Sequence, residues 1–258
     1  MRACRGPGTT AALRGIPQPL QGFNHCTMGS IPVRSVFVTG TDTGVGKTLV
    51  SAGLARTASD LGADVGVMKP FAAGSRDDVE LLIEAARCSD PSSLVNPQFY
   101  PLPASPYAAA RELGTAPDTG TVLECFERLQ KTHGVIIAEG IGGIMTPILS
   151  DYSVADLILD MGLGALVVVG NRIGAVNHSI LTARACKDAG VPIIGAVINC
   201  VDPGGYKADM LCRDVSELAG MEVLGAVPAL ESAGPKEAAL AVSTAIDVPG
   251  LLSLSLQT

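Results

Sequence analysis

A chain of 258 residues with 47% hydrophobic and 17% charged residues can bury a sizeable core, and it suits one large α/β domain. The net charge of −7 argues against nucleic acid as the main partner. The seven cysteines are scattered without a C-x-x-C pair and there are three histidines, which argues against a zinc or disulfide framework and favours reduced cysteines in a cytoplasmic protein. No uncharged apolar run reaches about 18 residues, so we expect no membrane span.

Residues 1–33 contain Gly and Pro but show no clear period. We expect them to be a disordered extension, or the product of an upstream start codon with Met28 as the true start. This stretch contains arginines but no acidic residues, so a targeting segment is an alternative interpretation. Residues 34–258 are expected to form a single domain.

A phosphate-binding loop is indicated by residues 36–48, which read VFVTGTDTGVGKT. An apolar strand ends at Gly40, a loop of small residues follows, and a helix is expected over 49–61. Glycines let backbone N–H groups turn toward an anion, and the helix start adds partial positive charge. Lys47 can then reach a terminal phosphate, and the Thr48 hydroxyl can ligate Mg²⁺. Thr41 occupies the position where such loops usually have their first glycine.

Strands and helices alternate along the rest of the chain. Residues 91–106 are rich in proline and read as a long surface loop near a site. The remaining expected strands are 65–69, 134–138, 165–169, 193–201 and 222–227, and the remaining expected helices are 79–87, 119–132, 154–161, 177–189, 206–219 and, more weakly, 236–245.

Most of these strands are continuously apolar, which indicates a mostly parallel central sheet with helices on both faces. Ligands of such sheets bind beyond the carboxyl ends of the strands. Polar residues stand at these ends: Lys47 follows the first strand, Lys69 ends the second, Glu139 follows the third and Asn199 lies in the fifth. The sequence therefore predicts one site at this edge.

Thr48, Asp78 and Glu139 can supply the oxygen ligands that Mg²⁺ prefers. Asp78 can equally be a solvated loop acid or a helix N-cap. A carboxylate at an apolar strand end, as at Glu139, is costly unless it is paired with a cation. Lys69 is either a strand-end lysine that reaches for solvent or a clamp for phosphate or substrate.

Two glycine-containing stretches can approach a ligand closely. Gly142 and Gly143 follow Glu139, and the alternative for them is an ordinary turn. Residues 171–177 open a helix whose free N–H groups can hold a carboxylate, and the alternative there is simple capping by Asn177.

Together these residues resemble the dethiobiotin synthetase family of P-loop NTPases over about residues 35–230. The resemblance is carried by the loop 40–48, by Lys69-Pro70 with Gly74, and by Glu139-Gly140-x-Gly142-Gly143 with Thr146-Pro147. It continues through Gly174, Asn177-His178, Leu181-Thr182-Ala183, Asn199 and Pro228.

The resemblance implies that 7,8-diaminononanoate, CO2 and ATP give dethiobiotin, ADP and phosphate, through a carbamate and a carbamic-phosphoric anhydride. It assigns catalysis to Lys47 and Lys69, and Mg²⁺ to Thr48, Asp78 and Glu139. It assigns ATP to Thr43, Gly44, Val45, Gly46, Lys47, Thr48, Glu139, Gly142, Asn199, Pro228, Ala229 and Leu230. It also implies a homodimer in which the partner's helix start near Gly174 and Asn177 meets the substrate carboxylate, with Ala73 near the substrate.

The chain departs from the family pattern at Ile141, where an alanine is common, and at Ala73, where Ser or Thr is common. Two alternative functions are that of a regulatory P-loop ATPase and that of a ligase resembling cobyrinate amide synthase that acts on another substrate. The first would have a second lysine where this chain has Asp42, and the second would need a further domain.

Overall fold

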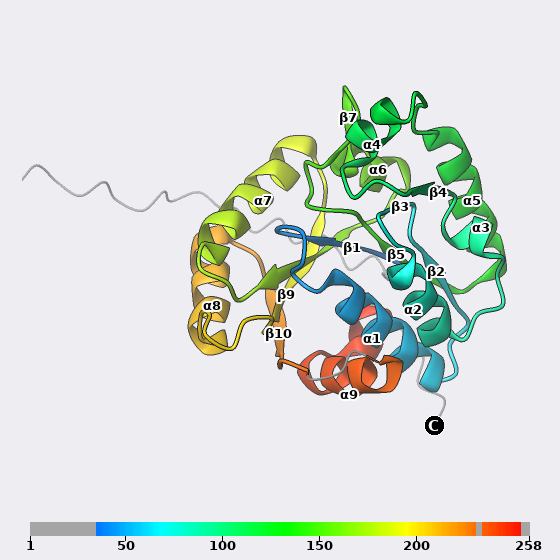
Figure 1. Cartoon of the computed structure of the whole chain (residues 1–258). Helices are drawn as coiled ribbons and strands as arrows, with labels where there is room; N and C mark the ends of the chain where they lie inside the picture. Colours follow the sequence, from blue (N-terminus) through cyan, green and yellow to red (C-terminus); the bar gives the residue numbers. More distant parts are fainter. Residues whose placement is uncertain (1–34, 231–233, 254–258) are drawn as a thin grey trace, which may run out of the picture. The chain divides into compact units, whose positions relative to one another are not determined.

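The computed structural model describes residues 35–230 and 234–253, so the extension expected at residues 1–33 lies outside the described residues. Within them, six parallel strands form the central sheet in the order β10-β9-β8-β1-β5-β2 (Figure 1). These strands are β1 (Val36–Gly40), β2 (Val65–Met68), β5 (Val135–Glu139), β8 (Ala165–Gly170), β9 (Ile193–Asn199) and β10 (Val223–Val227). The predicted parallel sheet is confirmed.

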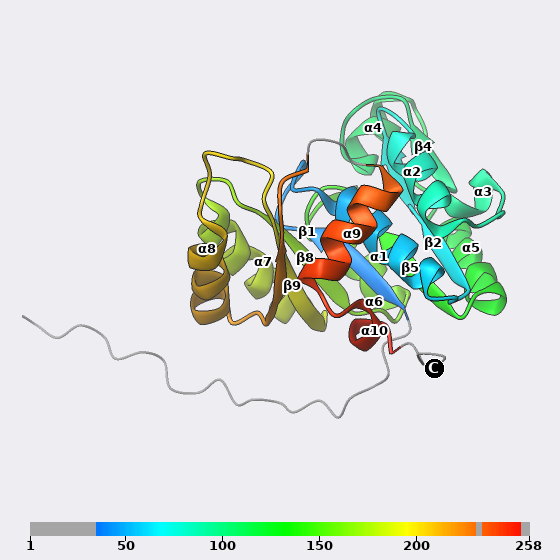
Figure 2. The ribbon, with the colours of Figure 1, turned by 90° about the horizontal axis from the view of Figure 1, so that it is seen from below.

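Helices cover both faces of this sheet, with α1 and α9 on one side of the strands and α6 and α7 on the other (Figures 1 and 2). Val36 and Val38 point into one core while Phe37 points into the other, which is why the strands are apolar throughout. The first face carries α1 (Lys47–Asp60), α2 (Asp77–Ala86), α9 (Pro235–Ala245) and α10 (Val248–Leu251). The second carries α5 (Thr119–Thr132), α6 (Val154–Asp160), α7 (Ala175–Ala189) and α8 (Ala208–Asp214), and α8 continues as a π-helical turn over Val215–Ala219.

Helix α9 packs directly against α1, the helix that follows the phosphate loop. A Cβ atom on Gly53 of α1 would lie 2.7 Å from the Ala238 carbonyl oxygen, so only glycine allows this approach. Ala238 and Val242 of α9 are fully buried there. The expected weak helix is therefore a regular part of the core, held by packing more than by its own sequence.

The expectation of a long surface loop over 91–106 is wrong. That segment contains α3 (Ser92–Val95), β4 (Gln98–Tyr100) and the start of α4 (Pro106–Glu112), and β4 pairs in parallel with β3 (Phe71–Ala73). Leu94, Val95 and Tyr100 are buried, so apolar residues between the prolines add to the core. A second small pair, β6 (Pro147–Leu149) with β7 (Tyr152–Ser153), follows the loop after β5.

Most predicted boundaries agree with the structure within two residues. Helix α7 begins at Ala175, with Gly174 at the N-cap in the left-handed region (φ 92°). The predicted alternative, in which Asn177 caps this helix, is therefore wrong, because Asn177 lies inside the first turn. No helix in residues 35–230 or 234–253 is both long and apolar enough to cross a membrane.

His133 joins three segments at the end of the sheet opposite the phosphate loop. Its Nδ1 lies 2.7 Å from Asp64 Oδ1, before β2, and its Nε2 lies 2.9 Å from Asp90 Oδ2, after α2. A neutral imidazole has one donor and one acceptor, so only the protonated ring can donate to both carboxylates. Burial lowers the pKa of His133, but the hydrogen bonds to Asp64 and Asp90 outweigh it, and the pKa is raised.

We therefore expect His133→Gln to lower the free energy of unfolding by about 1 kcal/mol at pH 6. A raised folded-state pKa stabilises the protein fully below the unfolded-state pKa of about 6.5, and this stabilisation is lost as pH rises through the folded-state value. Urea unfolding of both proteins from pH 5.5 to 9 tests this, with the exposed His178→Gln as control. A loss that stays constant over this range would contradict a role for the charged ring.

Candidate active site

The loop between β1 and α1 has the backbone of a phosphate cradle. Gly44 and Gly46 have φ values of 71° and 87°, which residues with a side chain rarely adopt. Asn199, at the end of β9, donates from Nδ2 to the Val45 carbonyl oxygen at 3.0 Å and so holds the loop. The Thr43 N–H donates to Asp42 Oδ1 at 2.7 Å, so this loop already hydrogen-bonds an anionic oxygen.

Lys47 opens α1, and its buried side chain turns back over the loop. Its Nζ donates to the Asp42 carbonyl oxygen at 3.0 Å. Burial, together with the charge of Lys69, lowers the pKa of Lys47 to about 8, although Glu139, Asp78 and Asp42 act in the opposite direction. An incoming phosphate would raise this pKa again and so favour the ammonium form further.

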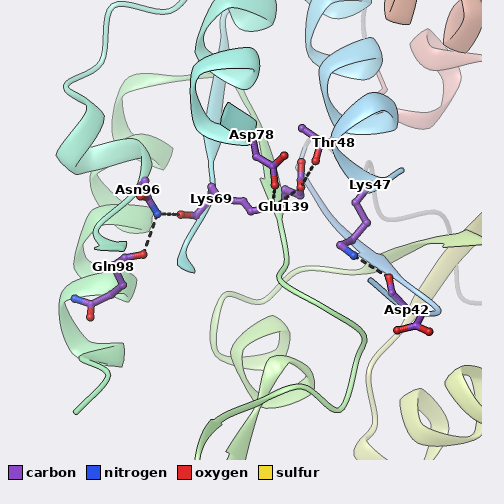
Figure 3. A network of polar contacts seen from close by, with 8 residues as sticks. All are labelled: Asp42, Lys47, Thr48, Lys69, Asp78, Asn96, Gln98 and Glu139. Carbon is purple, nitrogen blue, oxygen red and sulfur yellow. Dashed lines mark hydrogen bonds and ion pairs between the residues drawn. The ribbon is translucent and has the colours of Figure 1, made fainter. Parts of the chain in front are cut away.

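Beside the loop, Lys69 lies between two carboxylates (Figure 3). Its Nζ donates to Glu139 Oε1 and to Asp78 Oδ2, the latter at 2.9 Å, and the Thr48 hydroxyl donates to the same Glu139 oxygen at 2.8 Å. Lys69 directly follows β2 and Glu139 ends β5, and these neighbouring strands bring the two side chains together.

The protonation states of this network follow from its contacts. Burial lowers the pKa of Lys69, but the charges of Glu139 and Asp78 outweigh it, so the pKa is raised and the ammonium persists at neutral pH. Burial raises the pKa of Asp78, but the charge of Lys69 outweighs it, and the carboxylate stays ionised. Asp78 is the second residue of α2, where the helix dipole also favours an anion.

The oxygen atoms of this network suit a magnesium ion. Glu139 is fully buried, and its second oxygen, Oε2, has no hydrogen-bond partner among the described residues. A buried carboxylate oxygen without a donor is costly unless a cation takes it. The described ranges hold no group of three or more His, Cys, Asp or Glu side chains that could bind a metal. The site offers a smaller set of ligands, the carboxylates of Glu139 and Asp78 and the hydroxyl of Thr48. Such a small set of hard oxygen ligands fits Mg²⁺, which takes its other ligands from water and phosphate.

The loop after β5 completes the site on the side of the phosphate loop. Gly142 has φ 62°, and the Gly143 N–H donates to Thr146 Oγ1 at 2.9 Å. A Cβ atom on Gly143 would lie 3.4 Å from the Gly40 carbonyl oxygen, so the two loops pack closely. Beside them is an open hollow of about 470 Å³, whose lining includes Thr41, Asp42, Gly143, Thr146, His178, Leu181 and Thr182.

Comparisons with known proteins agree with this geometry. Residues 34–237 match the AAA domain family (AAA_26). An ATP-dependent dethiobiotin synthetase BioD of Nitrosopumilus maritimus is 47% identical over 203 residues, which cover 76% of this chain and 89% of that protein. Its counterpart in Bacillus licheniformis is 34% identical over 222 residues, covering 84% and 94%. The chain belongs to the ATP-dependent dethiobiotin synthetase family. Membership of this family makes it an ATP-dependent ligase, as predicted.

Solved structures agree on the fold. The MinD cell division protein of Aquifex aeolicus aligns with 88% of this chain and 98% of its own, at a TM-score of 0.53 and 15% identity. The MinC:MinD complex of the same organism gives a TM-score of 0.55 at 14% identity, covering 88% and 97%. At these identities the likeness shows the P-loop NTPase fold and nothing about activity.

Other residues singled out from the dethiobiotin synthetase pattern stand outside the Lys69 network. Pro228 and Ala229 are exposed after β10, with Leu230 packed against the first core. Ala73 ends β3 and Ile141 lies in the loop after β5, and both pack against the second core. Gly174 and Asn177 do not line the hollow, although His178 and Leu181 of the same helix do. The roles of these residues stay predictions.

One residue of the network was missed from the sequence. Asn96, after α3, is buried and donates from Nδ2 to the Lys69 carbonyl oxygen at 2.7 Å and to the Gln98 carbonyl oxygen at 3.0 Å. The Lys69 N–H donates to the Val95 carbonyl oxygen at 2.8 Å. This segment therefore holds the backbone from which Lys69 extends, and no pattern in the sequence distinguishes Asn96 from other loop asparagines.

Removing the central cation should destabilise the protein. Lys69→Met leaves Glu139 buried without a counter-charge, and we expect the free energy of unfolding to fall by about 3 kcal/mol. Adding Glu139→Gln should recover part of this loss, because the uncompensated charge is then absent. Urea unfolding of the two single variants and the double variant measures the coupling. Lys131→Met, an exposed lysine of α5, is the control, and strictly additive losses would contradict the ion pair.

Proposed function

We propose that the protein closes the ureido ring of dethiobiotin from 7,8-diaminononanoate and CO2 at the expense of ATP, in biotin biosynthesis. The single observation that carries this proposal is the buried Lys69 between Glu139 and Asp78, beside the phosphate loop. The names of its relatives in Nitrosopumilus maritimus and Bacillus licheniformis support the same reaction.

The reaction balances in three steps. One amine of the substrate attacks CO2 and loses a proton, giving a carbamate. A carbamate oxygen attacks the γ-phosphorus of ATP, and ADP leaves, giving a carbamic-phosphoric anhydride. The second amine then attacks the carbonyl carbon, phosphate leaves with the bonding electron pair, and the five-membered ring closes with loss of a proton.

The chain's own residues act by holding charge and position, because phosphoryl transfer requires little covalent chemistry from the protein. Lys47 binds the terminal phosphates through its ammonium group. Lys69, kept protonated by Glu139 and Asp78, holds the carbamate and the γ-phosphate together. Both carboxylates keep Lys69 in place, and Asn96 fixes its backbone.

ATP is proposed to lie along the loop from Thr43 to Thr48, with its base near Asn199 and Pro228–Leu230. The Asn199 Nδ2 atom is already bonded to the Val45 carbonyl oxygen, so its Oδ1 atom is the one free to accept from an adenine amino group. Gly142 borders the phosphates from the loop after β5. Thr48, Asp78 and Glu139 would hold Mg²⁺, which neutralises charge on the transferred phosphate.

The remaining parts of the proposal concern substrate and assembly. We propose a cytoplasmic homodimer in which the helix start at Gly174 and Asn177 of one subunit binds the carboxylate of the substrate held by the other, near Ala73. Gly174 supports this because it leaves the first N–H groups of α7 without a side-chain cap. No nucleic acid or membrane partner is proposed.

Product formation tests the whole proposal. With Mg²⁺, ATP and bicarbonate, ADP release should depend on 7,8-diaminononanoate, and mass spectrometry should find dethiobiotin. Lys47→Met should lower turnover at least 100-fold, because the phosphates lose the loop's own cation. ATP hydrolysis that is indifferent to the diamine would contradict the proposal and favour a regulatory P-loop ATPase.

Lys69→Met separates catalysis from binding. Because Lys69 is assigned to the reacting groups, we expect kcat to fall about 1000-fold, while the Kd for ATP changes by less than about fivefold. Calorimetry of ATP binding alongside the product assay measures both, and retained binding also shows that the variant is folded. Loss of ATP affinity with an unchanged kcat would overturn the assignment.

A further inference from the structure

A third cation lies against the phosphate loop, and no role has been given to it above. Arg172 stands in the loop between β8 and α7. A Cβ atom placed on Gly44 would lie 3.6 Å from Arg172 Nη1 and 3.7 Å from Nη2. The guanidinium group therefore sits directly over the tip of the phosphate loop, 128 positions later in the chain.

The backbone next to Arg172 is held firmly. The preceding residue, Asn171, is buried, and its Nδ2 donates to the Asp202 carbonyl oxygen at 2.7 Å while its Oδ1 accepts from the Asp202 N–H at 2.8 Å. The Asn171 N–H donates to the Asn199 carbonyl oxygen at 3.1 Å, and the Ala175 N–H donates to the Arg172 carbonyl oxygen at 3.0 Å. The position of Arg172 over the loop is thus built into the fold.

The charge of Arg172 is available to a ligand. The side chain is exposed, and its guanidinium group makes no hydrogen bond or ion pair with the described residues. The other two cations differ from it. Lys69 forms ion pairs with Glu139 and Asp78, and Lys47 donates a hydrogen bond to the Asp42 carbonyl oxygen. A bound triphosphate brings more negative charge than Lys47 alone can offset, even with a divalent cation.

We propose that Arg172 binds phosphate oxygens of the bound nucleotide and is the third cation of the phosphoryl-transfer site. A guanidinium group suits this task because its planar fork of N–H donors matches two phosphate oxygens, and it stays charged at every working pH. The proposal rests on ATP use by this site and does not depend on the identity of the second substrate.

The test is direct calorimetry of ATP binding to the full chain in Mg²⁺. Arg172→Gln should raise the Kd for ATP about tenfold, because the substitution removes one pair of charge-assisted hydrogen bonds to phosphate. Arg172→Lys, which keeps the charge but not the fork, should raise it about threefold. Arg184→Gln removes one exposed arginine farther along α7 and should leave the Kd unchanged.

Salt separates a charge contact from a merely structural one. The difference between the unsubstituted protein and Arg172→Gln should shrink as the ionic strength rises from 20 mM to 500 mM, because salt screens an exposed charge. An unchanged Kd for Arg172→Gln, or a loss of affinity that is independent of salt, would overturn the proposal. Failure to form dethiobiotin would leave this binding result standing, so the two proposals fail separately.

Discussion

The site depends on a buried ion network in which Lys69 lies between Glu139 and Asp78. Lys69 and Glu139 are buried, so either charge would be costly alone, and Lys69 lies within hydrogen-bond distance of both Glu139 and the half-exposed Asp78. Such a network contributes little net stability, since desolvation offsets most of the attraction. The buried Lys69–Glu139 pair is better explained by the proposed chemistry, because it keeps an ammonium group at a fixed place beside the phosphate loop.

The sheet supplies the geometry that makes this network possible. Parallel strands end at one edge, so Lys69 after β2, Glu139 at the end of β5 and the phosphate loop after β1 meet although they are far apart in the chain. Asn199 at the end of β9 reaches the same loop from the other side. The loop is therefore supported from strands on both sides of β1.

The regular elements, and the meeting of Lys69 and Glu139 at the edge of the sheet that carries the phosphate loop, were predictable from the sequence. Apolar runs and helical periodicity are local signals, and they identified the six strands of the main sheet and most helices within two residues. The short strands β3 and β4 were missed, because three-residue strands are specified by tertiary pairing and not by local pattern. Whether Asp78 is a site residue, a solvated loop acid or a helix N-cap could not be decided without the start of α2; in the structure Asp78 contacts Lys69. The positions of Asn96 and Arg172 likewise depend on where distant loops lie, which no spacing reveals.

The strand order also has a consequence for synthesis on the ribosome. β1 lies between β5 and β8, so it pairs with residues 135–139 and 165–170, which follow it in the chain. Residues 41–134 must be translated before β5, the earlier of the two partners, begins to emerge, which takes on the order of ten seconds at typical rates. During that interval the valines and phenylalanine of β1 lack their native neighbours. The nascent chain consequently exposes an apolar, unpaired strand for longer than a protein built from sequential hairpins, and it is a natural client for chaperones that bind such segments.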